Sequence, residues 1–343
     1  MTRHYDEFAW HFRRLARAYK DGQIVFVLGA GVSTDYGQPN WAALLADLLL
    51  RSGRVPRLGR NRPYGQPRAT NRRAELVEHA AITEILARVA PDPLLQGAIA
   101  KVAYPALRWR HAINGELGLD TERLVPPSEK DDPGVLWTIA EMLVKSIQRD
   151  PKRHISVLSF NYDLLLDRAV ERTLRDLHMR RSLVQTIDKG DDFERTWLDA
   201  GIYIYHLHGH LADELPEPIL DADSYVPVLR GDHWSWRCME RALASTGTSS
   251  LFIGLSLTDP SLRYVLTRWK SWQTPMTGVY LAPPPRLPSI SGCRDQRSVA
   301  LMYRSVMDLY SSVLDRLHLV CYYLSSYKEI GPILRFIRGH NDH

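Results

Sequence analysis

Two short polar segments of the chain hold side chains suited to acid–base chemistry and to hydrogen bonding of hydroxyl groups. They are SFNYD at 159–163 and HLHGH at 206–210. An imidazole titrates near neutral pH, so His208 is a candidate general base towards a hydroxyl group or an attacking water. The carboxamide of Asn161 can donate and accept hydrogen bonds, so it is a candidate to hold that hydroxyl or water.

Both segments also have simpler interpretations. Asn161 or Asp163 would serve equally well as the cap of a following helix. The three histidines could be core or hydrogen-bonding residues, and strand alternation would put them all on one face. A metal site is the less favoured alternative, because no Asp or Glu lies beside the histidines in the sequence.

Two glycine-containing turns are further candidate ligand-binding segments. GAGVSTDYGQP at 29–39 follows an apolar run, so its backbone amides and the helix after it could approach a pyrophosphate, with Ser33 as a hydroxyl donor. GLSLTDP at 254–260 places Gly254 and Ser256 towards a second nucleotide, while Asp259 is a helix cap or a ligand contact. Strand-to-helix turns often contain GxG for steric reasons alone, so the first turn does not decide the function.

All four segments follow predicted strands in a chain that alternates strands with helices. The predicted strands span residues 24–28, 155–160, 202–207, 251–255, 279–282 and 319–323. Helical spacing of apolar residues is found at 8–19, 41–49, 135–147, 164–170, 236–245, 260–271 and 298–316. This order is typical of an α/β fold with a Rossmann-like, doubly wound and mainly parallel sheet, which binds ligands at the carboxyl ends of its strands.

One part of the chain departs from the alternation. Residues 51–73 contain eight arginines and no acidic residue, which predicts a basic loop, and residues 74–110 have helical periodicity. We therefore expect a single domain over residues 1–343, with an Arg-rich loop and helical insertion at 51–130. The loop is either a solvated linker or a contact for a partner, nucleic acid or a dinucleotide.

Composition narrows the class of protein. The 343 residues are 45% hydrophobic and 24% charged, which is ordinary for a globular chain, and a net charge of +5 does not by itself indicate nucleic-acid binding. No signal peptide or membrane span is evident, so we expect a soluble, cytoplasmic protein. Cys238, Cys293 and Cys321 form no CxxC pair, which argues against a disulfide framework and a cysteine-based zinc site and favours inert thiols.

The four segments, in this order, resemble the sirtuin superfamily, in particular the SIR2-like domains of bacterial antiphage defence proteins. The resemblance spans about residues 20–325 apart from the insertion. It implies that NAD phosphates contact Gly29, Ala30, Gly31, Val32, Ser33, Gly37 and Pro39. The family's Asn-x-Asp falls on Asn161 and Asp163, and its catalytic His before Gly falls on His208. Its nucleotide-side Gly-x-Ser falls on Gly254 and Ser256, with Asp259 as a further candidate contact.

Some family features are absent. Deacylating sirtuins carry a zinc ribbon with two cysteine pairs, and their absence here argues against acyl-lysine peptides as substrates. The aromatic-Arg pair that often follows the family's first proline is missing, since Trp41 is followed by Ala42. His210 stands where defence-type domains usually have serine.

The resemblance implies a NAD+ hydrolase (NADase) that takes NAD as substrate, needs no metal, and releases nicotinamide and ADP-ribose or cyclic ADP-ribose. Asn161 would hold the ribose hydroxyls or the water, and His208 would act as general base. Such an enzyme would deplete NAD in antiviral defence by abortive infection, restrained as a homo-oligomer or by a partner such as a motor ATPase. A non-catalytic NAD or ADP-ribose sensor or scaffold, and protein ADP-ribosyl transfer, are the alternative functions.

Overall fold

The computed structural model describes residues 2–36, 134–197, 199–210, 219, 222–244, 248–257, 259–268, 278–282 and 296–339. The predicted helix at 41–49 and the insertion predicted at 51–130 lie outside these residues. So do Gly37 and Pro39 of the predicted phosphate turn, and Cys293. The division into one domain with an insertion therefore stays a prediction.

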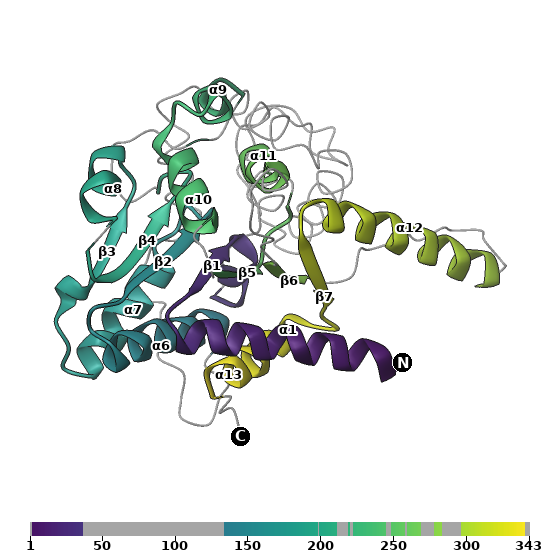
Figure 1. Cartoon of the computed structure of the whole chain (residues 1–343), viewed down its shortest axis with the longest axis horizontal. Helices are drawn as coiled ribbons and strands as arrows, with labels where there is room; N and C mark the ends of the chain where they lie inside the picture. Colours follow the sequence, from purple (N-terminus) through teal and green to yellow (C-terminus); the bar gives the residue numbers. More distant parts are fainter. Residues whose placement is uncertain are drawn as a thin grey trace, which may run out of the picture.

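Seven parallel strands form one sheet in the described part of the chain, in the order β3-β4-β2-β1-β5-β6-β7 (Figure 1). The strands are β1 Ile24–Leu28, β2 His154–Ser159, β3 Val184–Ile187, β4 Gly201–His206, β5 Ser249–Ile253, β6 Gly278–Ala282 and β7 Leu319–Tyr323. From the central β1 the chain first builds one side of the sheet and then returns to build the other. The prediction of a Rossmann-like, doubly wound α/β fold is confirmed.

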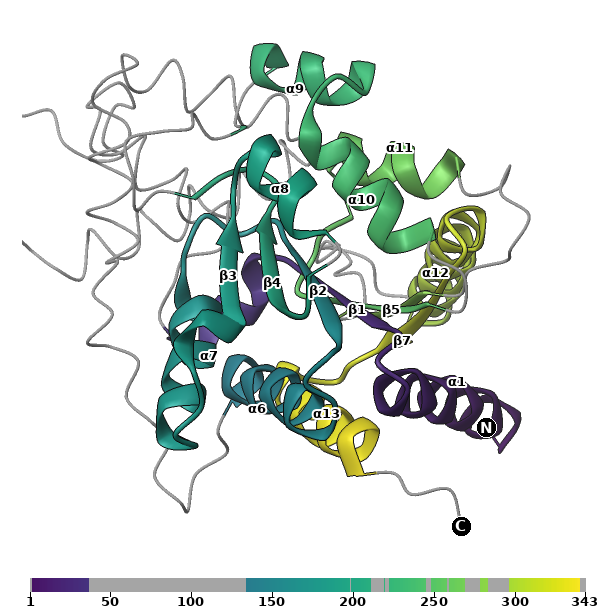
Figure 2. The same cartoon turned by 60° about the vertical axis from the view of Figure 1, so that its left-hand side comes forward.

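Helices cover both faces of the sheet, as Figures 1 and 2 show. One face packs against α1 Thr2–Lys20, α6 Gly134–Arg149, α7 Leu165–Asp176 and α13 Ile330–Gly339. The other face packs against α8 Gly190–Thr196, α10 Trp234–Ala244, α11 Pro260–Arg268 and the carboxyl end of α12 Gln296–Arg316. Helix α9, Ala222–Arg230, lies against α10 and α11. No helix in the described ranges is long and apolar enough to cross a membrane.

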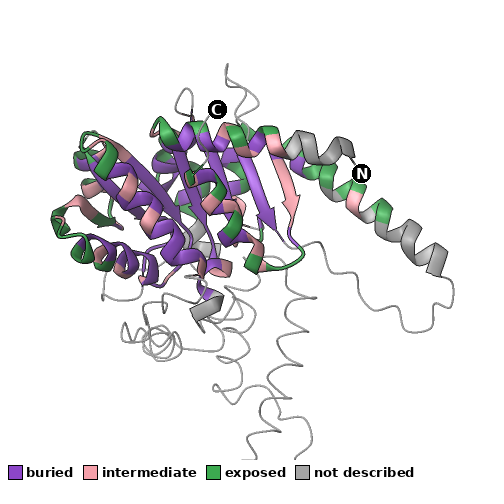
Figure 3. Ribbon diagram, turned by 90° about the horizontal axis from the view of Figure 1, so that it is seen from below, coloured by how far each residue is buried: buried purple, intermediate pink, exposed green. Residues whose placement is uncertain are grey.

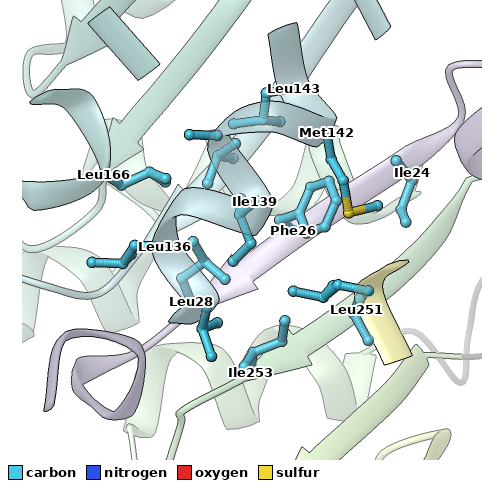
Figure 4. Packing of buried hydrophobic residues seen from close by; sticks show 14 of the residues in the cluster. Ile24, Phe26, Leu28, Leu136, Ile139, Met142, Leu143, Leu166, Leu251 and Ile253 are labelled. Carbon is cyan, nitrogen blue, oxygen red and sulfur yellow. The ribbon is translucent and has the colours of Figure 1, made fainter. Parts of the chain in front are cut away.

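The strand sequences explain why the sheet is buried on both faces. In β1, the side chains of Ile24, Phe26 and Leu28 pack on α6, where Figure 4 shows them beside Ile139 and Met142. The alternate residues of β1 belong to the hydrophobic cluster on the opposite face. A parallel strand covered on both sides reads as a continuous apolar run, which is why β1 is recognisable in the sequence and is buried at every residue. Figure 3 shows that most strands of the sheet are buried between the helices.

Several elements were not predicted from the sequence. They are the strand β3 and the helices α8, α9 and α13. β3 lies at the edge of the sheet, and its Gln185 and Thr186 are exposed, so it lacks the apolar run of a central strand. These elements matter for the site because β3 and the turn after it carry two of its polar residues.

Candidate functional site

The carboxyl ends of four neighbouring strands lie in register, so the four polar and glycine-containing segments leave the sheet in one row. Leu28 of β1 pairs with Ser159 of β2 and with Ile253 of β5. Ser159 in turn pairs with His206 of β4. Neighbouring strands lie about 4.8 Å apart, so the row from β4 to β5 spans roughly 14 Å. All four segments therefore lie at the same edge of the sheet, as the sequence predicts.

Glycine is required where the turn after β1 meets the turn after β5. Gly254 has a φ of +70°, and a Cβ on it would lie 2.6 Å from the amide nitrogen of Val32. A Cβ on Gly29 would lie 2.6 Å from the carbonyl oxygen of Gly254, and one on Gly31 would lie 2.7 Å from the Cα of Gly254. Because any side chain would collide with backbone, these glycines allow the two turns to touch.

The amides of this glycine turn are engaged within the protein. Gly29 donates to the last carbonyl of β5 at 3.0 Å, and Gly31 donates to the carbonyl of Gly254 at 2.9 Å. The amide of Val32 donates to the carbonyl of Gly29 at 3.1 Å. A 3-10 helix, η1 Ala30–Tyr36, follows directly, where the sequence favours a tight turn and then a regular helix. The glycines thus have a packing role, and phosphate binding by this turn stays a prediction.

Asn161 lies just beyond β2 and is held from three sides. Its Nδ2 donates to Oγ of Ser33 at 3.1 Å, and its backbone amide donates to Oγ of Ser159 at 3.3 Å. Its carbonyl accepts from Nδ1 of His206 at 3.1 Å. The residue is 6% exposed, and its Oδ1 has no hydrogen-bond partner within the described part of the chain. A buried amide oxygen without a donor is costly, so the site presents an acceptor suited to a hydroxyl or a water.

Asp163 bonds to the first amide of α7 and shares Ser33 with Asn161. Its Oδ1 accepts from the amide of Leu165 at 3.1 Å, and its carboxyl group also bonds to the hydroxyl of Ser33. Burial raises the pKa of Asp163, although the Leu165 amide, the Ser33 hydroxyl and the charge of His206 act in the opposite direction. Asp163 therefore bonds to the first amide of α7 from just outside the helix, whereas the N-cap position itself is held by Leu164. Ser33 joins the first turn to the second, and direct contact of either residue with NAD stays a prediction.

His208 lies in the turn after β4 and reaches across the row to the segment after β5. Its Nε2 lies 3.0 Å from Oδ2 of Asp259. Its ring meets the ring of Phe160 edge-on with centroids 5.0 Å apart, and lies 6.2 Å from the ring of Tyr162. Phe160 and Tyr162 are the sequence neighbours of Asn161, so the imidazole lies over the end of β2 beside the asparagine segment.

Asp259 serves both a helix and this imidazole. Its Oδ1 accepts from the amide of Leu262 at 2.8 Å and from the hydroxyl of Ser261. These two hydrogen bonds make Asp259 the cap of α11. Its Oδ2 faces His208, and a carboxylate behind a histidine orients the ring and stabilises its protonated form. The capping interpretation is confirmed, and the contact with His208 is added to it. A nucleotide contact by Asp259, or by the exposed Ser256, stays a prediction.

Ile219 ties two of these residues together. Its amide donates to the carbonyl of His208 at 2.9 Å, and its carbonyl accepts from the hydroxyl of Tyr162 at 2.7 Å. Burial, followed by the negative charge of Asp259, raises the pKa of Tyr162, so the phenol stays protonated and donates. The turn after β4 is therefore fixed to the turn after β2.

The sheet brings Asn161 and His208, which the sirtuin resemblance implies to be catalytic, to one edge of the fold. Residues 155–288 match the family model of the SIR2-like domain. This SIR2-like segment runs from β2 to just beyond β6 and contains Asn161, His208 and Asp259, whereas the glycine turn after β1 lies outside it. A SIR2-like domain indicates a NAD-related activity. No curated protein matches the chain.

The SIR2-like segment holds two further histidine–aspartate pairs that the sequence does not predict. Nε2 of His206 lies 3.1 Å from Oδ2 of Asp167, and Nε2 of His210 lies 3.2 Å from Oδ2 of Asp188. Asp167 comes from the first turn of α7 and Asp188 directly follows β3. The positions of these two aspartates in the sequence could have indicated the pairs, because an acidic residue that follows a strand, or lies in the next helix, reaches the same sheet edge.

The prediction that the three histidines share one face is wrong. β4 ends at His206, and Gly209, with a φ of +76°, turns the chain so that its amide donates to the carbonyl of His206 at 2.9 Å. The rings of His206 and His210 meet edge-on with centroids 5.5 Å apart, while His208 turns to Asp259. Strand alternation applies only inside a strand, and this one stops before the second histidine.

Metal and thiol chemistry receive no support from the site. Among the described residues, no group of three or more His, Cys, Asp or Glu side chains could hold a metal ion. Cys238 and Cys321 are free thiols, and burial raises the pKa of both. Thiolates are the reactive form, so neither of these cysteines is poised to act as a nucleophile.

Proposed function

We propose that the chain is a NAD+ hydrolase that cleaves the bond between nicotinamide and ribose. The observation that carries the proposal is the buried Oδ1 of Asn161, which has no donor within the described part of the chain. It lies at the sheet edge where His208 and Asp259 form their pair. A ribose hydroxyl or a water would supply the missing donor, and the SIR2-like match supports a nicotinamide dinucleotide as the substrate.

In this reaction the residues must orient the substrate hydroxyl or the water and accept one proton. As the bond to nicotinamide breaks, nicotinamide leaves with the bonding electrons and the ribose gains oxocarbenium character. Water adds to the same ribose carbon, and His208 accepts the proton that this water, or a ribose hydroxyl, gives up. Asp259 stabilises the resulting imidazolium, and Asn161 orients the hydroxyl or the water through Oδ1. The products are nicotinamide and ADP-ribose, or cyclic ADP-ribose where a group of the substrate replaces water.

We extend the proposal to the setting in which such an enzyme is useful. Uncontrolled NAD hydrolysis would harm the cell that makes it, so the activity needs restraint by homo-oligomerisation or by a partner such as a motor ATPase. NAD depletion during antiphage defence, ending in abortive infection, fits that requirement. This setting rests on the sirtuin resemblance and is tested with the partner protein encoded by the neighbouring gene.

The test is nicotinamide release from NAD by the purified chain, alone and with the neighbouring gene product. Asn161→Ala and His208→Ala should lose turnover by roughly 10²- to 10⁴-fold, because each removes a group that acts in the transition state. His178→Asn is the matched control, since His178 is exposed at the end of α7 with a φ of 54°, a conformation that asparagine tolerates.

The outcomes separate the alternative functions. NAD that remains intact for hours, while a control hydrolase consumes it, would refute the proposal. Binding of NAD or ADP-ribose without turnover would instead identify a sensor or scaffold. Radiolabel that passes from NAD onto protein would identify ADP-ribosyl transfer.

A further inference from the structure

A chain of hydrogen-bonded polar groups, buried except for Thr186, runs behind Asn161 through three other elements of the fold. Nδ1 of His206 contacts the Asn161 carbonyl at 3.1 Å, and Nε2 of His206 contacts Oδ2 of Asp167 at 3.1 Å. The other oxygen of Asp167 accepts from the hydroxyl of Thr186 at 2.5 Å. The chain thus links β3, α7, β4 and the turn after β2.

The chemistry of the two partners fixes the protons on His206. A carbonyl oxygen only accepts hydrogen bonds, so Nδ1 must carry a hydrogen. When Asp167 is a carboxylate it too only accepts, so Nε2 then carries the second hydrogen and the ring is an imidazolium paired with Asp167. Burial alone would lower the pKa of His206, but the charge and hydrogen bond of Asp167, with the Asn161 carbonyl and Asp163, raise it.

This buried pair is a poor device for stability alone. His206 is 1% exposed and Asp167 is 3% exposed, so both lose their hydration in the folded protein. Replacing a buried ion pair with apolar residues is often neutral or stabilising, so such pairs are better explained by the geometry that they impose. Here the geometry imposed is that of the Asn161 peptide.

The hydrogen bonds of Asn161 show which of its polar atoms is left open for a ligand. Its amide is held by Ser159, its Nδ2 by Ser33 and its carbonyl by His206. Oδ1 is the polar atom of Asn161 that remains without a partner in the described ranges. A residue clamped at three points, with its fourth polar group open, is preorganised for a ligand.

We propose that His206 is a positioning residue, which uses the Asp167–Thr186 support to lock the Asn161 peptide so that Oδ1 meets the substrate hydroxyl or water. The inference rests on the proposed NAD hydrolysis and deepens it, because it assigns a role to a histidine that does not itself touch the substrate. The contact of His206 with Asn161 acts directly and its contact with Asp167 supports the ring, so loss of the first should cost more turnover than loss of the second.

Two substitutions of His206 separate its two contacts. His206→Asn keeps a donor near the position of Nδ1, towards the Asn161 carbonyl, and loses the contact with Asp167. His206→Gln keeps a donor near the position of Nε2, towards Asp167, and loses the contact with Asn161. Both remove the ring and its charge, so each serves as the matched control of the other.

The measurements are kcat and KM for NAD with the full chain and its activating partner, the urea unfolding midpoint, and a crystal structure of each variant. We expect His206→Gln to lower kcat roughly 10²-fold at little change in KM, the cost typical of a misplaced catalytic group. His206→Asn should keep most of kcat. Its crystal structure should show Asn161 in place, and that of His206→Gln should show it displaced.

Equal kcat values for the two variants, or losses that simply follow the unfolding midpoints, would overturn the positioning role. Inactive wild-type protein would refute the proposed hydrolysis instead. In that case the crystal structures decide the inference: displacement of Asn161 in the glutamine variant alone supports it, and an unmoved Asn161 in both overturns it.

Discussion

Replacing Asp259 with asparagine separates the two tasks of its carboxylate. One oxygen caps α11 through the amide of Leu262 at 2.8 Å, and the other faces Nε2 of His208 at 3.0 Å. Asparagine is as good a helix cap as aspartate, so the cap survives. Its amide group carries no charge to stabilise a protonated imidazole, so the support of His208 is lost.

The size of the effect follows from the geometry. A hydrogen bond to a charged group is worth about 1.5–3 kcal/mol, and the contact between Asp259 and His208 gains that character when the imidazole takes up a proton. Each 1.4 kcal/mol is a factor of about ten in rate, so kcat should fall roughly 10- to 150-fold in Asp259→Asn. The free energy of unfolding should stay within about 0.5 kcal/mol of wild type, because the cap is kept.

The assay is nicotinamide release at saturating NAD, with urea unfolding on the same preparations. Asp259→Ala is the control: it should show the same loss of kcat and, in addition, lose about 1 kcal/mol of stability with the cap. A kcat in Asp259→Asn within twofold of wild type would refute the idea that this carboxylate supports the base. So would a loss of kcat that matches a loss of folded protein.

The remaining predictions concern stability and reactivity. Gly254→Ala should destabilise the protein by more than the roughly 1–2 kcal/mol of its left-handed φ of +70°, because its Cβ would lie 2.6 Å from backbone. Urea unfolding checks this against Gly231→Ala, whose φ is +81° but whose Cβ would meet nothing nearer than 3.7 Å. Burial alone would raise the pKa of Asp188, but its histidine partner lowers it, so its stabilisation is present above the ordinary carboxyl pKa of about 4 and is lost as pH falls through the lowered value. Acid unfolding should therefore depend less on pH in Asp188→Asn, and an unchanged acid limb would contradict this. Buried Cys238, with its raised pKa, should resist iodoacetamide at pH 8 in native protein and react after unfolding, as followed by mass spectrometry.

The central fold was predictable because of how it is buried. β1 reads as the apolar run Ile24–Leu28 because helices cover it on both faces, and β6 reads equally clearly at residues 278–282. β3 could not be recognised, because an edge strand with exposed Gln185 and Thr186 has no such run. Because β3 has no recognisable pattern, Asp188, which follows it, could not be placed at the sheet edge either.

Some residues of the candidate site could be selected from the sequence, but their pairings could not. Asn161 and His208 could be selected because each follows a predicted strand, and parallel strands end at one edge. The partner of His206 is 39 residues away in the sequence, on a different element, so local spacing carries no sign of it. The packing of Gly29 against Gly254 likewise depends on two strands being neighbours, which periodicity does not reveal.

The order of the strands also has a consequence during synthesis. The strands β1, β2 and β4 leave the ribosome before β5, which pairs with β1. The segment after β5 contains Gly254, which packs against the glycine turn, and Asp259, which pairs with His208. A nascent chain that ends before residue 248 already contains Asn161 and His208, yet the carboxylate behind the imidazole is missing. If the chain hydrolyses NAD as proposed, such a nascent chain lacks the carboxylate that supports the general base, so its turnover should stay low until β5 and the segment after it have been made.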